Sequence, residues 1–402
     1  MLLSLAVVFL VGISVGAIFR KLRLPGIVGM LASGIVVGPY VLDLLDPSLL
    51  GISTELRQIA LIIILIRAGF SLDPSDLRKV GRPAVLMSFL PACFEIAGYL
   101  IFAPLLLGIS RIEAAVMGAV ISAVSPAVIV PRMIRLIEEK RGTEKGIPQM
   151  ILAGASCDDI FVIVLFGTFV TMAQGGAASA VDLANIPISI ILGMLLGTGA
   201  GFLLYFVFEI TRKKGQNIRG SYKTLIILAA AFVLMASETF LKNYVALSGL
   251  LAVVTMACVL KIKQDSGVTE RLSQKLGKLW LAAEILLFML VGAAVDIRCT
   301  LEAGASAVGL IFIALVFRMI GVLLCLIGTK LSLREMLFCV IAYIPKATVQ
   351  AAIGSVPLPL GLPCGRIVLS VAVLAIIITA PLGAIGIDTS CKKLLDKFHY
   401  VS

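Results

Sequence analysis

The stretch PQMILAGASCDDIFVIVLFGTFVTMA, residues 148–173, is largely apolar but carries two adjacent aspartates, Asp158 and Asp159, near its middle. Its length fits a helix that crosses the hydrocarbon core of a bilayer, for which about 20 residues are needed. An ionised side chain at that depth costs roughly 3 kcal/mol even on lenient insertion scales. The pair therefore predicts an ion or proton site, and the alternative is two structural acids that are paired with bases.

The composition of the whole chain is that of a membrane protein. Of its 402 residues, 60% are hydrophobic and 14% are charged, whereas a soluble domain carries about 25% charged residues. We therefore expect an all-α polytopic membrane protein in which residues 1–402 form a single transmembrane unit. Apolar runs predict about thirteen spans, near residues 2–19, 26–41, 53–72, 83–107, 112–136, 148–173, 184–210, 223–241, 244–261, 276–295, 301–328, 335–355 and 366–387.

The distribution of basic residues predicts the orientation of these spans. Most of the 34 lysines and arginines lie in alternate connections, with clusters at residues 20–23, 132–145 and 212–223. Cytoplasmic loops carry the excess of basic residues. We therefore expect the N-terminus outside and the C-terminus in the cytoplasm of a cell (plasma) membrane, such as a bacterial inner membrane. The net charge of +11 then belongs to short cytoplasmic loops, and no nucleic-acid partner is expected.

Signals of enzymatic or ATP-driven chemistry are missing from the sequence. The single histidine, His399, lies in the C-terminal tail, and neither a P-loop nor a glycine-rich nucleotide fingerprint occurs. We expect no cofactor and no enzyme activity, and we expect ion gradients to supply the energy for any transport.

Charged residues on four expected spans lie at a similar depth. At about 1.5 Å per residue, Glu95, Asp158, Arg318 and Lys346 each lie about 15–18 Å from the cytoplasmic end of their span. Isolated charges near the middle of a bilayer are costly and usually pair with one another. Arg318 could pair with Glu95 or with Asp158, and the sequence favours Glu95, because that pair leaves both aspartates free.

Two of the expected spans also carry helix breakers at mid-depth. Ser122, Ser125 and Pro126 lie together in one of them, and Pro345 and Lys346 lie in the other, followed by Thr348 and Gln350. The two spans are seven apart in the chain, and an odd offset gives two copies of a repeat opposite orientations. Broken helices at the interface of inverted repeats are the usual site of alternating access. Lys346 and the serine hydroxyls could offset the partial charges of the half-helix ends.

Four motifs resemble those of the sodium/proton antiporters in the monovalent cation:proton antiporter superfamily, most closely its NHA branch. They are Ala-Val-Ser-Pro-Ala-Val-Ile-Val-Pro (123–131), Glu-Lys-Gly-Ile-Pro (144–148), Ala-Ser-Cys-Asp-Asp-Ile (155–160) and Ile-Pro-Lys-Ala-Thr-Val-Gln-Ala-Ala-Ile-Gly (344–354). The resemblance implies a NhaA-like inverted-repeat antiporter fold with two helices broken near the midplane, and a homodimer in membrane lipid. It also implies core repeats at 83–173 and 301–387, which move against dimerisation or scaffold helices at 1–72 and 184–295.

In such antiporters the second aspartate of the pair binds the cation, which here is Asp159, and the first, Asp158, assists it or pairs with a base. Well-known electrogenic bacterial members have lysine where this chain has Arg318. Arginine essentially never deprotonates, so the charge stoichiometry of exchange stays open.

The chemistry of the residues points the same way. Sodium and lithium prefer oxygen ligands, and Asp159, Asp158, Ser122, Ser125 and carbonyls freed by Pro126 could supply them. Because a proton and a cation compete for one carboxylate, the sequence predicts sodium (lithium)/proton antiport. The alternatives are a potassium/proton antiporter, a sodium-coupled organic-anion symporter on a related fold, and a channel or a receptor that does not transport.

Overall fold

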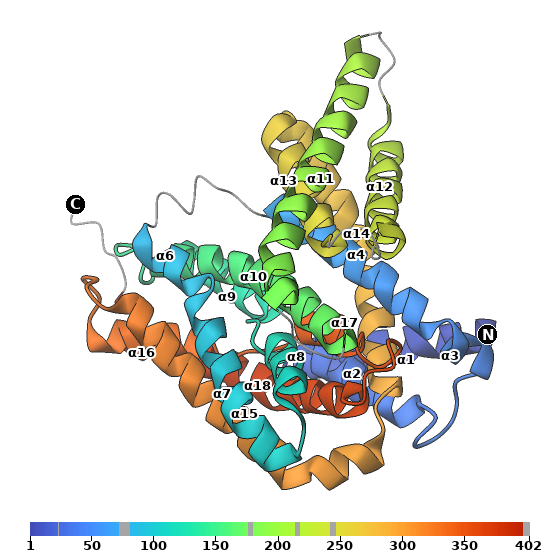
Figure 1. Ribbon diagram of the computed structural model, residues 1–402. Coiled ribbons are helices and arrows are strands. Elements are labelled where there is room, and N and C mark those ends of the chain that lie inside the picture. The colour runs from blue at the N-terminus through green and yellow to red at the C-terminus, as the bar shows by residue number, and fades with distance from the viewer. Residues whose placement is uncertain (23, 72–80, 176–179, 214–217, 242–246, 397–402) are drawn as a thin grey trace. The chain divides into compact units, whose positions relative to one another are not determined.

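The computed structural model describes residues 1–22, 24–71, 81–175, 180–213, 218–241 and 247–396, and its regular elements there are α-helices (Figure 1). The helices are α1 (Leu2–Lys21), α2 (Gly26–Val37), α3 (Pro47–Gly51), α4 (Ser53–Ser71), α6 (Arg82–Met87), α7 (Leu90–Leu107), α8 (Arg111–Ile121), α9 (Pro126–Glu138), α10 (Ile147–Gln174), α11 (Ala180–Lys213), α12 (Gly220–Leu241), α13 (Gly249–Lys263), α14 (Ser266–Ala293), α15 (Ile297–Leu326), α16 (Leu333–Ala342), α17 (Thr348–Gly354) and α18 (Gly365–Leu394). The all-α class predicted from the sequence is confirmed.

In the described ranges, nine helical stretches are long and apolar enough to cross a membrane, by length and composition. Each of them overlaps an expected span. The remaining expected spans, near 26–41, 53–72, 244–261 and 335–355, correspond to α2, α4, α13 and the pair α16 and α17. These helices are shorter, broken or more polar, so the total of about thirteen spans stays a prediction.

The chain divides into two compact units. One combines residues 1–54, 73–162 and 287–402, and the other combines residues 55–72 and 163–286. In the second unit, α13 packs against both α11 and α12. All the candidate site residues lie in the first unit. The sequence predicted a different division, into core repeats and dimerisation helices that move against each other. That division remains a prediction.

Within the first unit, α7 and α15 lie side by side (Figure 1). Glycines permit this close approach: a Cβ added at Gly321 would lie 2.8 Å from the Cα of Pro91, and one added at Gly98 would lie 3.3 Å from the Cα of Ala314. Small residues let helix backbones come together in membranes, where apolar burial alone gives little attraction between helices. The contact brings the middle of α7 next to the middle of α15.

Two helices of the first unit are interrupted, at residues 122–125 between α8 and α9 and at residues 343–347 between α16 and α17. Each first half starts with a reciprocal capping box, Ser110 with Glu113 in α8 and Ser332 with Glu335 in α16. The first halves contain 11 and 10 residues, or about 16 Å and 15 Å of helix. Each first half is therefore about half as long as a hydrocarbon core of about 30 Å is thick, which fits the mid-depth breaks that the prolines predicted.

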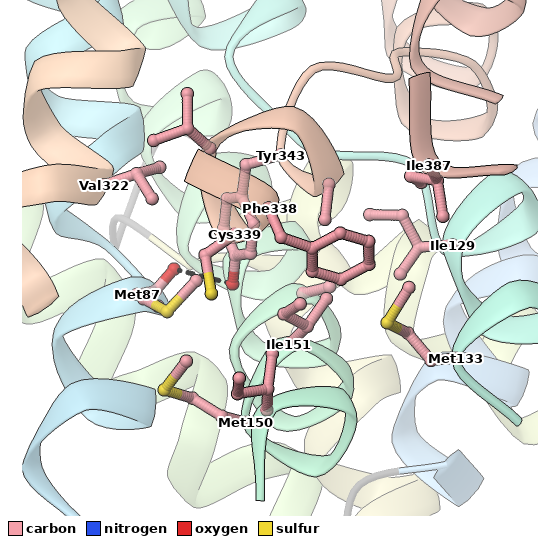
Figure 2. Packing of buried hydrophobic residues seen from close by; sticks show 14 of the residues in the cluster. Met87, Ile129, Met133, Met150, Ile151, Val322, Phe338, Cys339, Tyr343 and Ile387 are labelled. Atoms are coloured by element: carbon pink, nitrogen blue, oxygen red, sulfur yellow. Dashed lines mark hydrogen bonds between the residues drawn. The ribbon is translucent and has the colours of Figure 1, made fainter. Parts of the chain in front are cut away.

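An apolar cluster fixes the position of α10 beside the second break. Figure 2 shows the ring of Phe338 from α16 pointing toward Ile151 of α10 and Ile129 of α9, and all three side chains are fully buried or nearly so. Close by, the Tyr343 hydroxyl donates a hydrogen bond of 3.4 Å to the carbonyl of Met87. Because Ile151 lies two helical turns before Asp158, this packing sets the height of the aspartates along α10.

Candidate functional site

The two aspartates of α10 are both buried but have different surroundings. Asp158 Oδ2 accepts hydrogen bonds from the backbone N–H of Val124 at 2.8 Å and from Arg318 Nη2 at 3.0 Å. Asp159 points about 100° around the helix from it. Its Oδ1 is buried and has no hydrogen-bond partner among the described residues. The first carboxylate is therefore held by the protein, and the second is left free to bind something else.

Arg318 of α15 is the centre of the buried polar cluster and is 1% exposed. Its Nη1 lies 2.8 Å from Glu95 Oε2 and its Nη2 lies 3.0 Å from Asp158 Oδ2. The sequence left these two pairings as alternatives, and the structure has both. The guanidinium also donates to the carbonyl of Tyr343 from Nε, at 2.9 Å, and to that of Ser122 from Nη1. A planar group with five N–H donors can serve this many partners at once.

Lys346 lies in the second break, and its side chain reaches the same cluster. Its Nζ lies 2.5 Å from Glu95 Oε2, and its backbone N–H donates to the hydroxyl of Thr379 at 3.0 Å. Two cations, Arg318 and Lys346, thus face two carboxylates, Glu95 and Asp158. Buried charges are tolerated when they are paired and hydrogen-bonded, and here the four charges balance without Asp159.

The two breaks touch each other directly. The backbone N–H of Ser125 donates to the carbonyl of Pro345 at 2.8 Å. The hydroxyl oxygens of Ser122 and Ser125 are buried, and neither has a hydrogen-bond partner in the part of the chain that the structure describes. The sequence also suggested that carbonyls freed by Pro126 would bind the cation. The carbonyl that lacks a helical partner because of Pro126 is that of Ser122, and Arg318 already donates to it.

Three residues contribute to the cluster without having been assigned a role from the sequence: Tyr343, Gln350 and Thr379. Gln350 was noticed only because it follows Pro345. Thr379 gave no signal, because a threonine in an apolar span usually bonds the carbonyl four residues before it, as Thr379 also does to Ala375 at 2.7 Å. Tyr343 acts through its backbone carbonyl, which any residue would provide.

Comparisons with known proteins show the family to which the chain belongs. Residues 5–393 match the family described as sodium/hydrogen exchanger, transmembrane. The chain is 33% identical to sodium/hydrogen exchanger 9B2 of Xenopus tropicalis over 356 residues, which is 86% of this chain and 64% of that protein. It is 32% identical to sodium/hydrogen exchanger 9B1 of Homo sapiens over 425 residues, 99% of this chain and 79% of that one. The chain therefore spans less than two thirds of the length of the frog relative.

The fold is similar to that of the sodium proton antiporter MjNhaP1 from Methanocaldococcus jannaschii. The TM-score is 0.78 with 22% sequence identity, and the likeness covers 97% of each chain. It supports the inverted-repeat antiporter architecture for the fold alone. The match over residues 5–393, the curated relatives and the spans described above together show that this multi-pass membrane protein belongs to the sodium/hydrogen exchanger family.

Proposed function

We propose that the chain exchanges sodium or lithium for protons by alternating access, and that Asp159 carries either the cation or the proton. The observation that supports this most strongly is that Asp159 is a buried carboxylate whose Oδ1 has no hydrogen-bond partner in the described part of the chain. A buried, unpaired carboxylate is costly when charged, so it takes up a proton or a hard cation. Since it cannot hold both, the two ions compete, and competition at one group couples their movements in opposite directions.

The oxygen atoms that lack hydrogen-bond partners at the first break and on α10 suit a small cation. Among the described residues, the buried side-chain oxygens without a hydrogen-bond partner include Asp158 Oδ1, Asp159 Oδ1, Ser122 Oγ and Ser125 Oγ. These are the side chains that the sequence suggested as ligands. Hard cations bind oxygen ligands, and carboxylates and hydroxyls supply them here.

The alternative functions would each require different properties of the buried charged residues. An organic-anion symporter needs a basic group that is free to meet its substrate, but Arg318 and Lys346 are both engaged by carboxylates. The relatives carry the names sodium/hydrogen exchanger and sodium proton antiporter, which supports a cation as substrate. Oxygen ligands alone do not fix ion size, so potassium/proton exchange is the second candidate.

Flux measurements in proteoliposomes test the proposal. Adding sodium or lithium outside should cause proton movement that saturates with cation concentration, and potassium should cause less. Larger movement with potassium would make this a potassium/proton antiporter. Flux without proton movement would indicate a channel, and a complete lack of flux would indicate a protein that does not transport.

Competition for one carboxylate predicts a specific dependence on pH. On the acid side of the titration, the apparent affinity for sodium should fall about tenfold for each unit by which the pH falls, because one proton must leave for each cation that binds. The measurement is the apparent KM for sodium over a series of pH values in proteoliposomes. An affinity that does not vary with pH would place the proton and the cation at separate sites.

We also propose that the protein works as a homodimer in a plasma membrane, with its N-terminus outside and its C-terminus in the cytoplasm. Lys330 and Arg366 are both exposed and lie in connections that the proposal places on opposite sides. In a variant without native cysteines, an impermeant maleimide added to intact cells should label Arg366→Cys but should label Lys330→Cys only after permeabilisation. The reverse pattern would invert the orientation.

A further inference from the structure

One side chain, Gln350 of α17, joins the two breaks, and the exchange mechanism above does not use it. Gln350 is fully buried. Its Nε2 donates to the carbonyls of Ile121 at 3.1 Å and Ala123 at 2.6 Å, and its Oε1 accepts from the N–H of Ala347 at 2.7 Å. A glutamine side chain has two N–H donors, so both of its donors are given to the opposite broken helix.

The effect on the first break is to occupy its carbonyl oxygens. Ile121 is the last residue of α8, where carbonyls have no partner within the helix. Gln350 holds the carbonyls of Ile121 and Ala123, and Arg318 holds the one between them. Three consecutive carbonyls beside the candidate site thus accept hydrogen bonds from buried side chains. The oxygens left for a cation are those of carboxylates and hydroxyls.

From this geometry we propose that Gln350 is a positioning residue that sets cation selectivity by keeping the carbonyls of Ile121 and Ala123 away from the transported ion. This inference rests on the proposed function. Carboxylate oxygens carry a high charge and favour a small cation, whereas the number and field strength of neutral carbonyl ligands decide whether a larger cation is accepted. When the donors of Gln350 are removed, the site gains carbonyl ligands and its preference moves from sodium toward potassium.

The test is Gln350→Met, which keeps the length of the side chain and removes both donors. The readout is the ratio of the apparent KM values for potassium and sodium in proteoliposomes, measured beside the ratio of the concentrations of the two ions that stabilise the detergent-purified protein against heat. We expect both ratios to fall about tenfold, the change in an equilibrium constant that corresponds to one net hydrogen bond. If Gln350→Met does not fold, Gln350→Glu keeps the acceptor for Ala347 and, once ionised, lacks the donors.

A matched control separates a change in ion selectivity from a general weakening of the contact between the two breaks. Thr379→Val removes the hydroxyl that accepts from Lys346 N and leaves the carbonyls of the first break untouched. It should lower rates for all cations alike without changing either ratio. Unchanged ratios in the Gln350 variants would overturn the inference. If the wild-type protein is stabilised by cations but moves no protons, the proposed function fails while the thermal ratio still decides the role of Gln350. If no cation stabilises it, both are overturned.

Discussion

Replacing Asp159 with asparagine should abolish cation-driven proton movement while leaving the folded protein intact. Asparagine has the same shape as aspartate but binds neither a proton nor a hard cation strongly. The change leaves no partner of Asp159 Oδ1 unpaired, because that atom has none among the described residues. Exchange is measured as sodium-induced proton movement in proteoliposomes, and folding as yield and melting temperature.

Asp158→Asn is the matched control for this prediction. It removes the charge that faces Arg318 Nη2, so it should lower the melting temperature as well as the rate. Loss of transport without loss of stability should thus be particular to Asp159. Normal exchange in Asp159→Asn would remove Asp159 from the mechanism.

Arg318→Ala should destabilise the protein strongly, by about 3–5 kcal/mol, the cost of breaking a buried ion pair by removing one partner. The structure also indicates which carboxylate would be left without a basic partner. Glu95 keeps Lys346 at 2.5 Å, whereas the one partner that Asp158 keeps among the described residues is the N–H of Val124. Adding Asp158→Asn should therefore restore much of the lost stability. The measurement is the melting temperature of the purified single and double variants.

Glu95→Gln in the Arg318→Ala background is the opposite case. It would leave Lys346 without its carboxylate, so we expect no recovery. The sequence favoured Glu95 as the partner of Arg318 and would have predicted rescue here. The structure revises that expectation, because the sequence did not show that Lys346 reaches the same oxygen of Glu95. Equal recovery from both second changes would mean that Lys346 does not hold Glu95 in the membrane.

The sequence predicted depth well and rotation about the helix axis poorly. Helix rise and bilayer thickness are fixed lengths, so counting residues placed Glu95, Asp158, Arg318 and Lys346 at one level, and the structure brings these four together. Which side chain faces which depends on the rotation of each helix, and that follows from packing such as the glycine contacts between α7 and α15. The double pairing of Arg318 could not be found by counting.

Some of the missing information was present in the sequence. Ser110-Arg-Ile-Glu113 and Ser332-Leu-Arg-Glu335 are both capping-box patterns, and each marks the start of a half-helix that ends at a break. Together they would have given the lengths of both half-helices in advance. The hydrogen bonds of Gln350 are different, because the carbonyls it reaches are more than two hundred residues away along the chain and have no side-chain signature.

The nearly equal lengths of the two capped half-helices have an electrical consequence. In the predicted inverted repeat α8 and α16 enter from opposite faces, which would place an ion at the crossing of the two breaks about halfway through the membrane field. Moving one elementary charge between the crossing and either aqueous phase then involves roughly 1 kcal/mol at 100 mV. An imposed voltage should therefore shift cation binding from the two faces by factors of equal size and opposite direction, so the membrane potential favours loading of the site from the positive face.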